Sequence, residues 1–216
     1  AGVKVCSEQA PKIAEQLSTD GWSVGRTSLR TRNTSNTADQ WELKTLVDFE
    51  KLKQTLPDSF TVAVDVRPSI ETIKKQIASG FDYFQVHFSE IHDSAYLSVL
   101  SETVGRDRLW LAPKLPPGML FPESLFQYAD TFLIDTYHIE GFGGSGKTGD
   151  WAGFKQLNID YPEKYWILAG GLNAENIGAA LKLANPQIVD TSSGVELSPG
   201  IKSSEKLRSF FSQLPV

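Results

Sequence analysis

Cysteine, positive charge and long apolar segments are all scarce in this chain of 216 residues. A single cysteine excludes a disulfide within the chain, which is usual in a reducing compartment and predicts a cytoplasmic location. The formal net charge of -5 argues against a nucleic-acid partner, because such binders need a basic face. No apolar run approaches the roughly 18 residues of a bilayer-spanning helix, so we expect no membrane partner.

Motifs for two common classes of enzyme are missing as well. The chain has no G-x-S-x-G element, so a hydrolase built on that nucleophile turn has little support. Its three histidines, His87, His92 and His138, do not combine with nearby carboxylates at the spacing of metal ligands. We therefore expect no metal.

What the chain does have is a regular alternation of short apolar runs with amphipathic stretches. Most apolar runs end at a polar residue or glycine, and several are rich in β-branched or aromatic residues, as parallel strands buried on both faces are. These predicted strands are Val3–Cys6, Trp22–Val24, Phe60–Val66, Tyr83–His87, Leu109–Ala112, Thr131–Asp135, Tyr165–Ala169 and Ile188–Asp190. The predicted helices are Pro11–Leu17, Leu43–Leu56, Ser69–Ala78, Ser94–Val104, Glu123–Tyr128, Trp151–Leu157, Ala174–Leu183 and Ser203–Phe211.

Eight strands alternating with eight helices predict an α/β fold with a parallel sheet. An open doubly wound sheet is the alternative, but the count of eight and the lack of an obvious edge strand favour closure. We therefore predict a single (β/α)8 TIM barrel, formed by residues 1–216 as one domain. The longest irregular stretch, Arg26–Gln40, follows the second strand and would lie over the catalytic face.

Two strand–helix junctions near the C-terminal end are rich in small residues. Gly170 and Gly171 follow the seventh predicted strand, and Ser193 and Gly194 follow the eighth. Glycine lets backbone N–H groups approach an anion, and a helix N-terminus adds a positive partial charge. Barrels commonly hold phosphate after these two strands, so the two junctions together predict a phosphate site. Either junction alone is equally consistent with an ordinary tight turn.

The segment from Gly141 to Thr148 matches the G-x-x-x-x-G-K-[ST] pattern of a nucleotide-binding P-loop. A P-loop needs a strand that feeds the loop directly and a helix that begins at its Gly-Lys-Thr. Here the strand ends several residues earlier, and the next helix is expected near Trp151. We interpret the segment as a loop that closes over the active site.

Three further side chains are placed by their strands at the mouth of the predicted barrel. Cys6 ends the first strand, His87 the fourth and Asp135 the sixth. A cysteine with a lowered pKa can act as general base, and an aspartate with a raised pKa as general acid. The residues alone leave two plainer alternatives open, a buried apolar filler at Cys6 and a cap or loop hydrogen bond at Asp135.

Four segments together resemble phosphoribosylanthranilate isomerase of tryptophan biosynthesis, in their order and in their spacing. They are residues 132–136 (FLIDT), 143–151 (GGSGKTGDW), 167–177 (ILAGGLNAENI) and 189–200 (VDTSSGVELSPG). Residues 4–6 and 84–87 look like the family's first and fourth strands. The resemblance implies a (β/α)8 barrel that converts phosphoribosylanthranilate into carboxyphenylamino-deoxyribulose phosphate by an Amadori rearrangement. It implies no cofactor, because the anthranilate nitrogen drives ring opening to a Schiff base.

The resemblance also implies roles for individual residues. Asp135 would be the general acid that protonates the ribose ring oxygen, and Cys6 the general base that removes the C2′ proton. Asp190 would line the mouth after the eighth strand. Amide groups would hold the phosphate at Gly170, Gly171, Ser193 and Gly194.

The sequence departs from the family pattern in the half that would hold the anthranilate group. The arginine that binds the substrate carboxylate is replaced by a longer loop, in which Arg30 or Arg32 could substitute. Asp65 stands where an aromatic residue is usual, and its charge would repel that carboxylate unless it is paired, for example by Arg67. Ser7, Phe88 and the pair Pro113-Lys114 also differ from the pattern.

These departures leave two alternatives to the isomerase. One is a paralogue that acts on another phosphosugar, and the other is a non-catalytic barrel that binds a phosphometabolite. In every case the expected partner is a small phosphorylated molecule. The sequence does not determine the oligomeric state.

Overall fold

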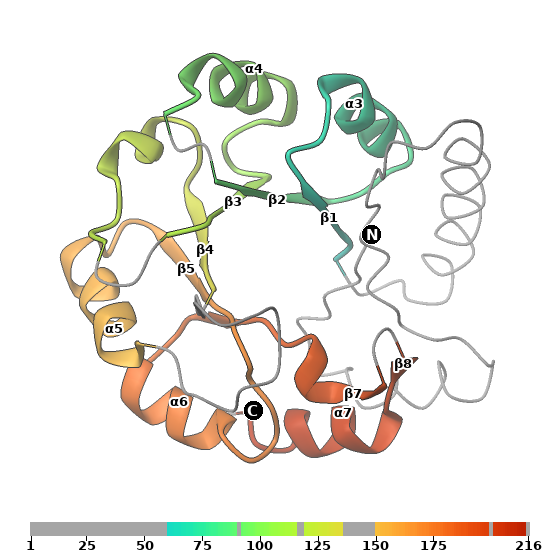
Figure 1. Ribbon diagram of the computed structural model, residues 1–216, viewed down its shortest axis with the longest axis vertical. Coiled ribbons are helices and arrows are strands. Elements are labelled where there is room, and N and C mark those ends of the chain that lie inside the picture. Colours follow the sequence, from blue (N-terminus) through green and yellow to red (C-terminus); the bar gives the residue numbers. More distant parts are fainter. Residues whose placement is uncertain (1–59, 90–91, 116–118, 136–149, 199–200, 215–216) are drawn as a thin grey trace.

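The computed structural model describes residues 60–89, 92–115, 119–135, 150–198 and 201–214. Its central feature is one parallel sheet in which six strands pair in chain order and curve around the centre of the molecule (Figure 1). The strands are β1 (Val62–Val66), β2 (Tyr83–Phe88), β3 (Leu109–Pro113), β4 (Thr131–Ile134), β5 (Tyr165–Leu168) and β6 (Ile188–Val189).

Helices connect these strands and lie on the outside of the curved sheet (Figure 1). They are α3 (Ile70–Ala78), α4 (Ser94–Val104), the 3-10 helix η1 (Glu123–Gln127), α5 (Trp151–Asp160), α6 (Ile177–Ala184), the 3-10 helix η2 (Ser193–Val195) and α7 (Ser204–Phe211). Four of them begin at a residue whose side chain accepts an N–H of the first turn, which satisfies a donor that the helix itself leaves open. These capping residues are Ser69, Asp93, Asp150 and Ser203.

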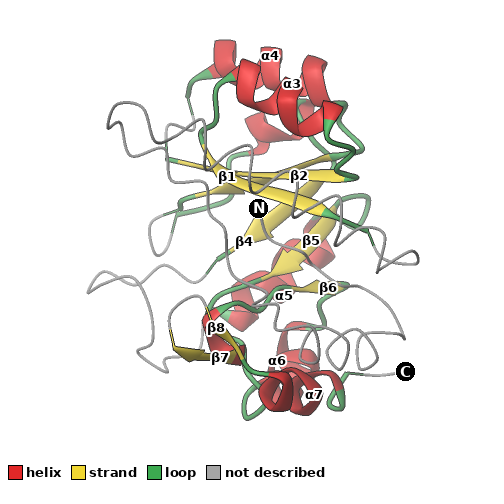
Figure 2. Cartoon of the chain, turned by 90° about the vertical axis from the view of Figure 1, so that its right-hand side faces the viewer, coloured by secondary structure: helices red, strands yellow, loops and turns green. Residues whose placement is uncertain are grey.

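The two faces of the sheet bury two separate apolar clusters. Alternate residues of each strand, such as Phe84 and Val86 of β2, pack outward against the helices in the larger cluster. The intervening residues face inward, where Trp110, Leu133 and Ile167 meet in the smaller cluster. Figure 2 shows α3 and α4 on one side of the strands and α5, α6 and α7 on the other. Along each strand, the inward-facing positions continue to its carboxyl end.

Most of the predicted elements agree with the observed ones in the part of the chain that the structure describes. Six of the predicted strands are present, and the helix predicted for Ser94–Val104 has those bounds. The prediction for 123–128 was wrong in type, because that segment forms the 3-10 helix η1. The strands predicted at Val3–Cys6 and Trp22–Val24, and the helices predicted at Pro11–Leu17 and Leu43–Leu56, lie outside the described residues.

A short hairpin follows β6 and was not predicted. Its strands, β7 (Glu196–Ser198) and β8 (Ile201–Lys202), pair antiparallel beside α7 (Figure 2). Strands of two or three residues leave too little alternation for a sequence pattern to reveal. Among the helices within the described ranges, none has both the length and the apolar character that crossing a membrane requires.

Candidate active site

Three of the predicted site residues lie at the same edge of the sheet. Because all six strands run parallel, their carboxyl ends meet there. His87 lies near the end of β2, Asp135 follows β4 and Asp190 follows β6. Backbone hydrogen bonds continue one residue beyond these strands, from Ala169 N to Ile134 O at 3.0 Å and from Asp190 N to Leu168 O at 2.8 Å. The pairing thus brings Asp135 and Asp190 to one level, on either side of the small residue Ala169.

Strand alternation places these side chains on the inward face. Asp135 and Asp190 come two residues after Leu133 and Ile188, which both belong to the inner apolar cluster. The Asp135 side chain is exposed and that of Asp190 is half-buried, as expected of carboxyls above a filled barrel interior. Two acidic groups therefore cap the apolar centre next to the glycine-rich junctions.

His87 has a neighbour that the sequence patterns did not single out. Gln85 precedes it by two residues on the same face of β2, is 2% exposed, and its Nε2 lies 2.7 Å from His87 Nε2. An amide Nε2 can only donate, so His87 Nε2 is the acceptor and the neutral ring carries its proton on Nδ1. A polar residue in the middle of a strand expected to be buried was the available signal.

The first predicted phosphate junction has the backbone that glycine permits. Gly170 and Gly171 have φ angles of 97° and 65°, in a region that disfavours side chains. Space beside Gly171 is open, since nothing lies within 4 Å of the position that a Cβ would take. In the described part of the chain, neither glycine donates its N–H to a protein acceptor. The junction therefore presents two amide donors beside open space.

The second junction is interlocked with the first. Thr191 Oγ1 donates to the carbonyl oxygen of Leu172 at 2.7 Å, and a Cβ built at Gly194 would lie 1.9 Å from that same oxygen. Only glycine allows this approach of the two backbones. Gly170, Gly171, Ser193 and Gly194 are thus brought together at one place.

The turn that precedes α6 uses several of its own amide groups. Asn173 Oδ1 accepts the N–H groups of Glu175 and Asn176, and Asn176 Oδ1 accepts that of Asn173. These side chains use the donors of a turn that delays the helix to Ile177, three residues later than predicted. The glycine amides that precede this turn are open donors at the junction.

The expected conflict at Asp65 does not arise, because that residue faces the other side of the sheet. Its side chain is 6% exposed and accepts from Val66 N and from Gln76 Nε2 of α3, at 2.7 and 3.3 Å. Arg67 forms an ion pair with Asp93. Strand alternation thus keeps the Asp65 carboxylate away from the mouth.

Arg67 also lies over the ring of Tyr96, 4.9 Å from its centroid. Burial raises the pKa of Tyr96 to about 12, and its hydroxyl donates to the Pro68 carbonyl. The phenol therefore stays protonated at neutral pH, and this group of side chains fixes the loop between β1 and α3. Phe88 belongs to the same outer layer, where its ring is buried among the core residues.

The position at which α5 begins argues against a P-loop. β4 ends at Ile134, and α5 begins at Trp151 with Asp150 as its cap. A nucleotide-binding loop would begin its helix at the lysine of the motif. The segment from Gly141 to Thr148 itself lies outside the described residues, so its role as a closing loop stays a prediction.

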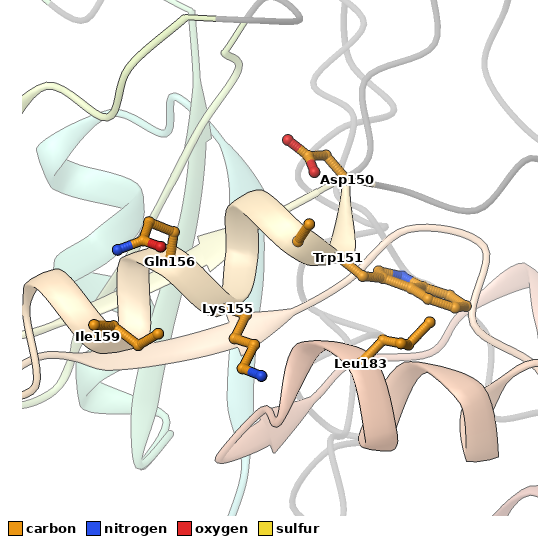
Figure 3. Close-up of a pocket in the computed structure, with 7 residues that line it drawn as sticks. Asp150, Trp151, Lys155, Gln156, Ile159 and Leu183 are labelled. Carbon is orange, nitrogen blue, oxygen red and sulfur yellow. The ribbon is translucent and has the colours of Figure 1, made fainter.

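A groove on the outer surface lies between α5 and α6 (Figure 3). Trp151 lies over Leu183 of α6, and Ile159 follows along the same side of α5. The groove is lined by helix residues on the outside of the sheet, whereas the predicted site residues lie at the carboxyl edge of the strands. It is therefore separate from the candidate active site.

The protein-family description N-(5'phosphoribosyl)anthranilate (PRA) isomerase matches residues 17–213. The chain belongs to this family. The match confirms the resemblance on which the sequence prediction rested, and with it the prediction of an isomerase. It covers Arg30, Arg32, Asp65, Phe88 and Pro113-Lys114, so the departures at these positions are variation within the family, whereas Ser7 lies before the matched range.

Individual relatives support the same assignment. The N-(5'-phosphoribosyl)anthranilate isomerase of Nostoc punctiforme is 49% identical over 160 residues, which are 73% of this chain and 74% of that protein. The enzyme of the same name from a Synechococcus strain is 34% identical over 172 residues, 76% of this chain and 75% of that protein. The phosphoribosyl anthranilate isomerase structure from Thermotoga maritima is 28% identical, with a TM-score of 0.62 over 78% of this chain and 79% of that one. The predicted (β/α)8 barrel is thereby confirmed, and the described residues supply six of its strands.

Several predicted site residues remain untested. Cys6, Arg30 and Arg32 lie outside the described residues. No group of three or more His, Cys, Asp or Glu side chains suited to a metal ion occurs in the described ranges, and the expected absence of a metal stays a prediction.

Proposed function

We propose that this chain, as a member of its family, isomerises N-(5'-phosphoribosyl)anthranilate with Asp135 as general acid and Cys6 as general base. The observation that carries this proposal is the arrangement at one edge of the sheet. Asp135 and Asp190 lie at one level there, beside two interlocked junctions that offer amide donors. A phosphosugar needs both parts, an anion site for its phosphate and an acid within reach of its ring.

The chemical steps balance without a co-reactant. Asp135 donates a proton to the ribose ring oxygen as the C1′–O bond breaks, and the anthranilate nitrogen lone pair forms the Schiff base. Cys6, as thiolate, then removes the proton from C2′, which returns the electron pair to nitrogen and gives an enol. The enol tautomerises to the ketone of the product. Ring opening and removal of the C2′ proton each use one side chain, as general acid–base catalysis requires.

The amides at Gly170, Gly171, Ser193 and Gly194 support binding of the phosphate. Neutral donors fixed by the backbone bind an anion without a net positive charge, which suits a chain of charge -5. His87 and Asp190 would contact the sugar and aglycone from β2 and β6. Arg30 or Arg32 would pair with the anthranilate carboxylate.

The proposal is tested by mixing purified protein with phosphoribosylanthranilate and following the loss of its fluorescence. We expect turnover, and we expect Asp135→Asn and Cys6→Ala each to lower kcat by about 10²–10⁴. Asp107→Asn is the matched control, because this exposed aspartate lies in the turn before β3, at the opposite edge of the sheet. Near wild-type rates in Asp135→Asn or Cys6→Ala would remove that residue's role.

The two alternative functions give different results in the same assay. A paralogue for another phosphosugar would bind inorganic phosphate and leave phosphoribosylanthranilate unchanged, yet turn over a related phosphosugar amine. A non-catalytic binder would turn over neither. We place the reaction in the cytoplasm and in one domain over residues 1–216, as the single cysteine and the alternation of elements predict.

A further inference from the structure

The hairpin after η2 carries a buried ion pair that contacts the second phosphate junction. Lys202 of β8 and Glu196 of β7 have side chains only 10% and 12% exposed, and Lys202 Nζ lies 2.6 Å from Glu196 Oε1. Burying two charges costs more than an exposed pair returns, unless other hydrogen bonds compensate. Here they do, because the ammonium group also contacts Ser192.

Lys202 Nζ donates to the Ser192 carbonyl oxygen at 2.8 Å and lies 3.3 Å from Ser192 Oγ. The same carbonyl also accepts from Val195 N at 3.3 Å. Ser192 therefore has its carbonyl fixed towards the hairpin by a cation that is itself fixed by Glu196. Hydrogen bonds from a charged donor are about twice as strong as neutral ones.

The peptide that Lys202 holds is the one whose N–H belongs to Ser193. The chain has no cis peptide bond in its described part, and in a planar trans peptide the C=O and N–H point in opposite directions. A Ser192 carbonyl directed at the hairpin therefore directs the Ser193 N–H away from it. In the described part of the chain this N–H has no protein acceptor, and the Ser193 side chain is exposed.

We propose that Lys202 is a positioning residue for phosphate binding, which orients and polarises the Ser192–Ser193 peptide so that the Ser193 amide binds the substrate phosphate. The charge on Lys202 draws electron density to the carbonyl oxygen and makes the N–H of the same peptide a stronger donor. Glu196 keeps the ammonium in place. On the other side of the loop, Thr191 and Gly194 hold the junction against Leu172.

This inference rests on the proposed function, and the test uses a variant that leaves no buried charge without a partner. In Lys202→Met combined with Glu196→Gln, we expect KM for phosphoribosylanthranilate and the Kd for inorganic phosphate to rise on the order of tenfold, a change of about 1.4 kcal/mol. We expect kcat to stay within about threefold, because the acid and base are untouched. Lys202→Arg keeps the cation and should recover part of the phosphate affinity.

Lys164→Met is the matched control. Lys164 is also a buried lysine, with a side chain 11% exposed, and it is paired with Asp130 just before β4 and β5, at the amino edge of the sheet. Its loss should reduce stability and leave both phosphate measurements unchanged. A folded double variant with wild-type phosphate affinity would overturn the inference, because the pair would then be purely structural.

A second measurement on the wild-type protein applies even if the double variant does not fold. Titration with inorganic phosphate should move the amide proton resonance of Ser193 downfield, and an unmoved resonance would also overturn the inference. The two proposals fail separately. Phosphate binding without turnover would refute the isomerase function and leave the role of Lys202 intact, whereas turnover with an unmoved Ser193 amide would do the reverse.

Discussion

Gly194 lies so close to the carbonyl oxygen of Leu172 that a Cβ on it would be 1.9 Å from that atom. The contact joins the loop after β5 to the loop after β6. The atoms of Leu172 nearest to Gly194 belong to the backbone. Neither loop can accommodate a side chain there without moving. The mutual position of the two sets of amide donors therefore depends on residue 194 having no side chain.

Gly194→Ala should separate the two junctions and weaken phosphate binding. Overpacking of this kind costs about 1–3 kcal/mol, so we expect a lower melting temperature and a KM raised on the order of tenfold. Gly178→Ala is the control, because Gly178 lies exposed within α6 and nothing is within 4 Å of its added Cβ. That change should stabilise the helix by roughly 0.5–1 kcal/mol and leave KM unchanged. Equal KM values in both variants would contradict the interlocking role.

Asp65→Asn tests the orientation of β1. Because the Asp65 carboxylate faces α3 and accepts from Gln76, we expect the loss of its charge to lower stability by about 1–3 kcal/mol. Steady-state kinetics should give kcat and KM within about twofold of wild type. A marked fall in KM would mean that the carboxylate repels the substrate after all.

Gln85→Leu tests the orientation of His87. In the wild-type protein, nitrogen NMR of the imidazole should show the proton on Nδ1, since Nε2 accepts from Gln85. The leucine variant removes that donor, so the tautomer preference should weaken and KM should rise on the order of threefold. The exposed His92 serves as internal control, and its signals should not change. A proton found on Nε2 in the wild type would reverse the assignment of the Gln85 amide.

The ion pairs of Asp130 should make stability depend on pH at acid values. Its hydrogen bond to Arg106, helped by Lys164, holds the pKa of the Asp130 carboxyl below its ordinary 3.8. A carboxyl whose pKa is lower in the folded state than in the unfolded state stabilises the fold at pH values above its unfolded pKa. This contribution is lost as the pH falls through the folded pKa. The side chain is 37% exposed, so we expect about 1 kcal/mol or less. Urea unfolding of wild type and Asp130→Asn should differ at pH 7 and converge below pH 3.8; a constant difference would contradict the assignment.

The repeating pattern of the sequence was sufficient for most of the described fold. Parallel strands buried on both faces are continuous apolar runs, and these located β1 through β6 within one or two residues at most ends. The same pattern did not distinguish η1 as a 3-10 helix, began α6 three residues early and missed the hairpin. Local side-chain hydrogen bonds at Asn173 and Asn176 shifted the start of α6, and β7 and β8 are too short to show a period.

Residue types and their order along the chain by themselves determined which family this is and which groups could do the chemistry. Asp135 and Asp190 end predicted strands and the glycines of the two junctions follow predicted strands, and parallel strands bring their carboxyl ends together whatever the details of packing. Only the tertiary structure decided which face each strand residue occupies and which loops touch. It turned Asp65 away from the mouth, set Gln85 against His87 and brought Lys202 to Ser192. Those relationships depend on strand register and on contacts between segments distant in sequence, which no local pattern encodes.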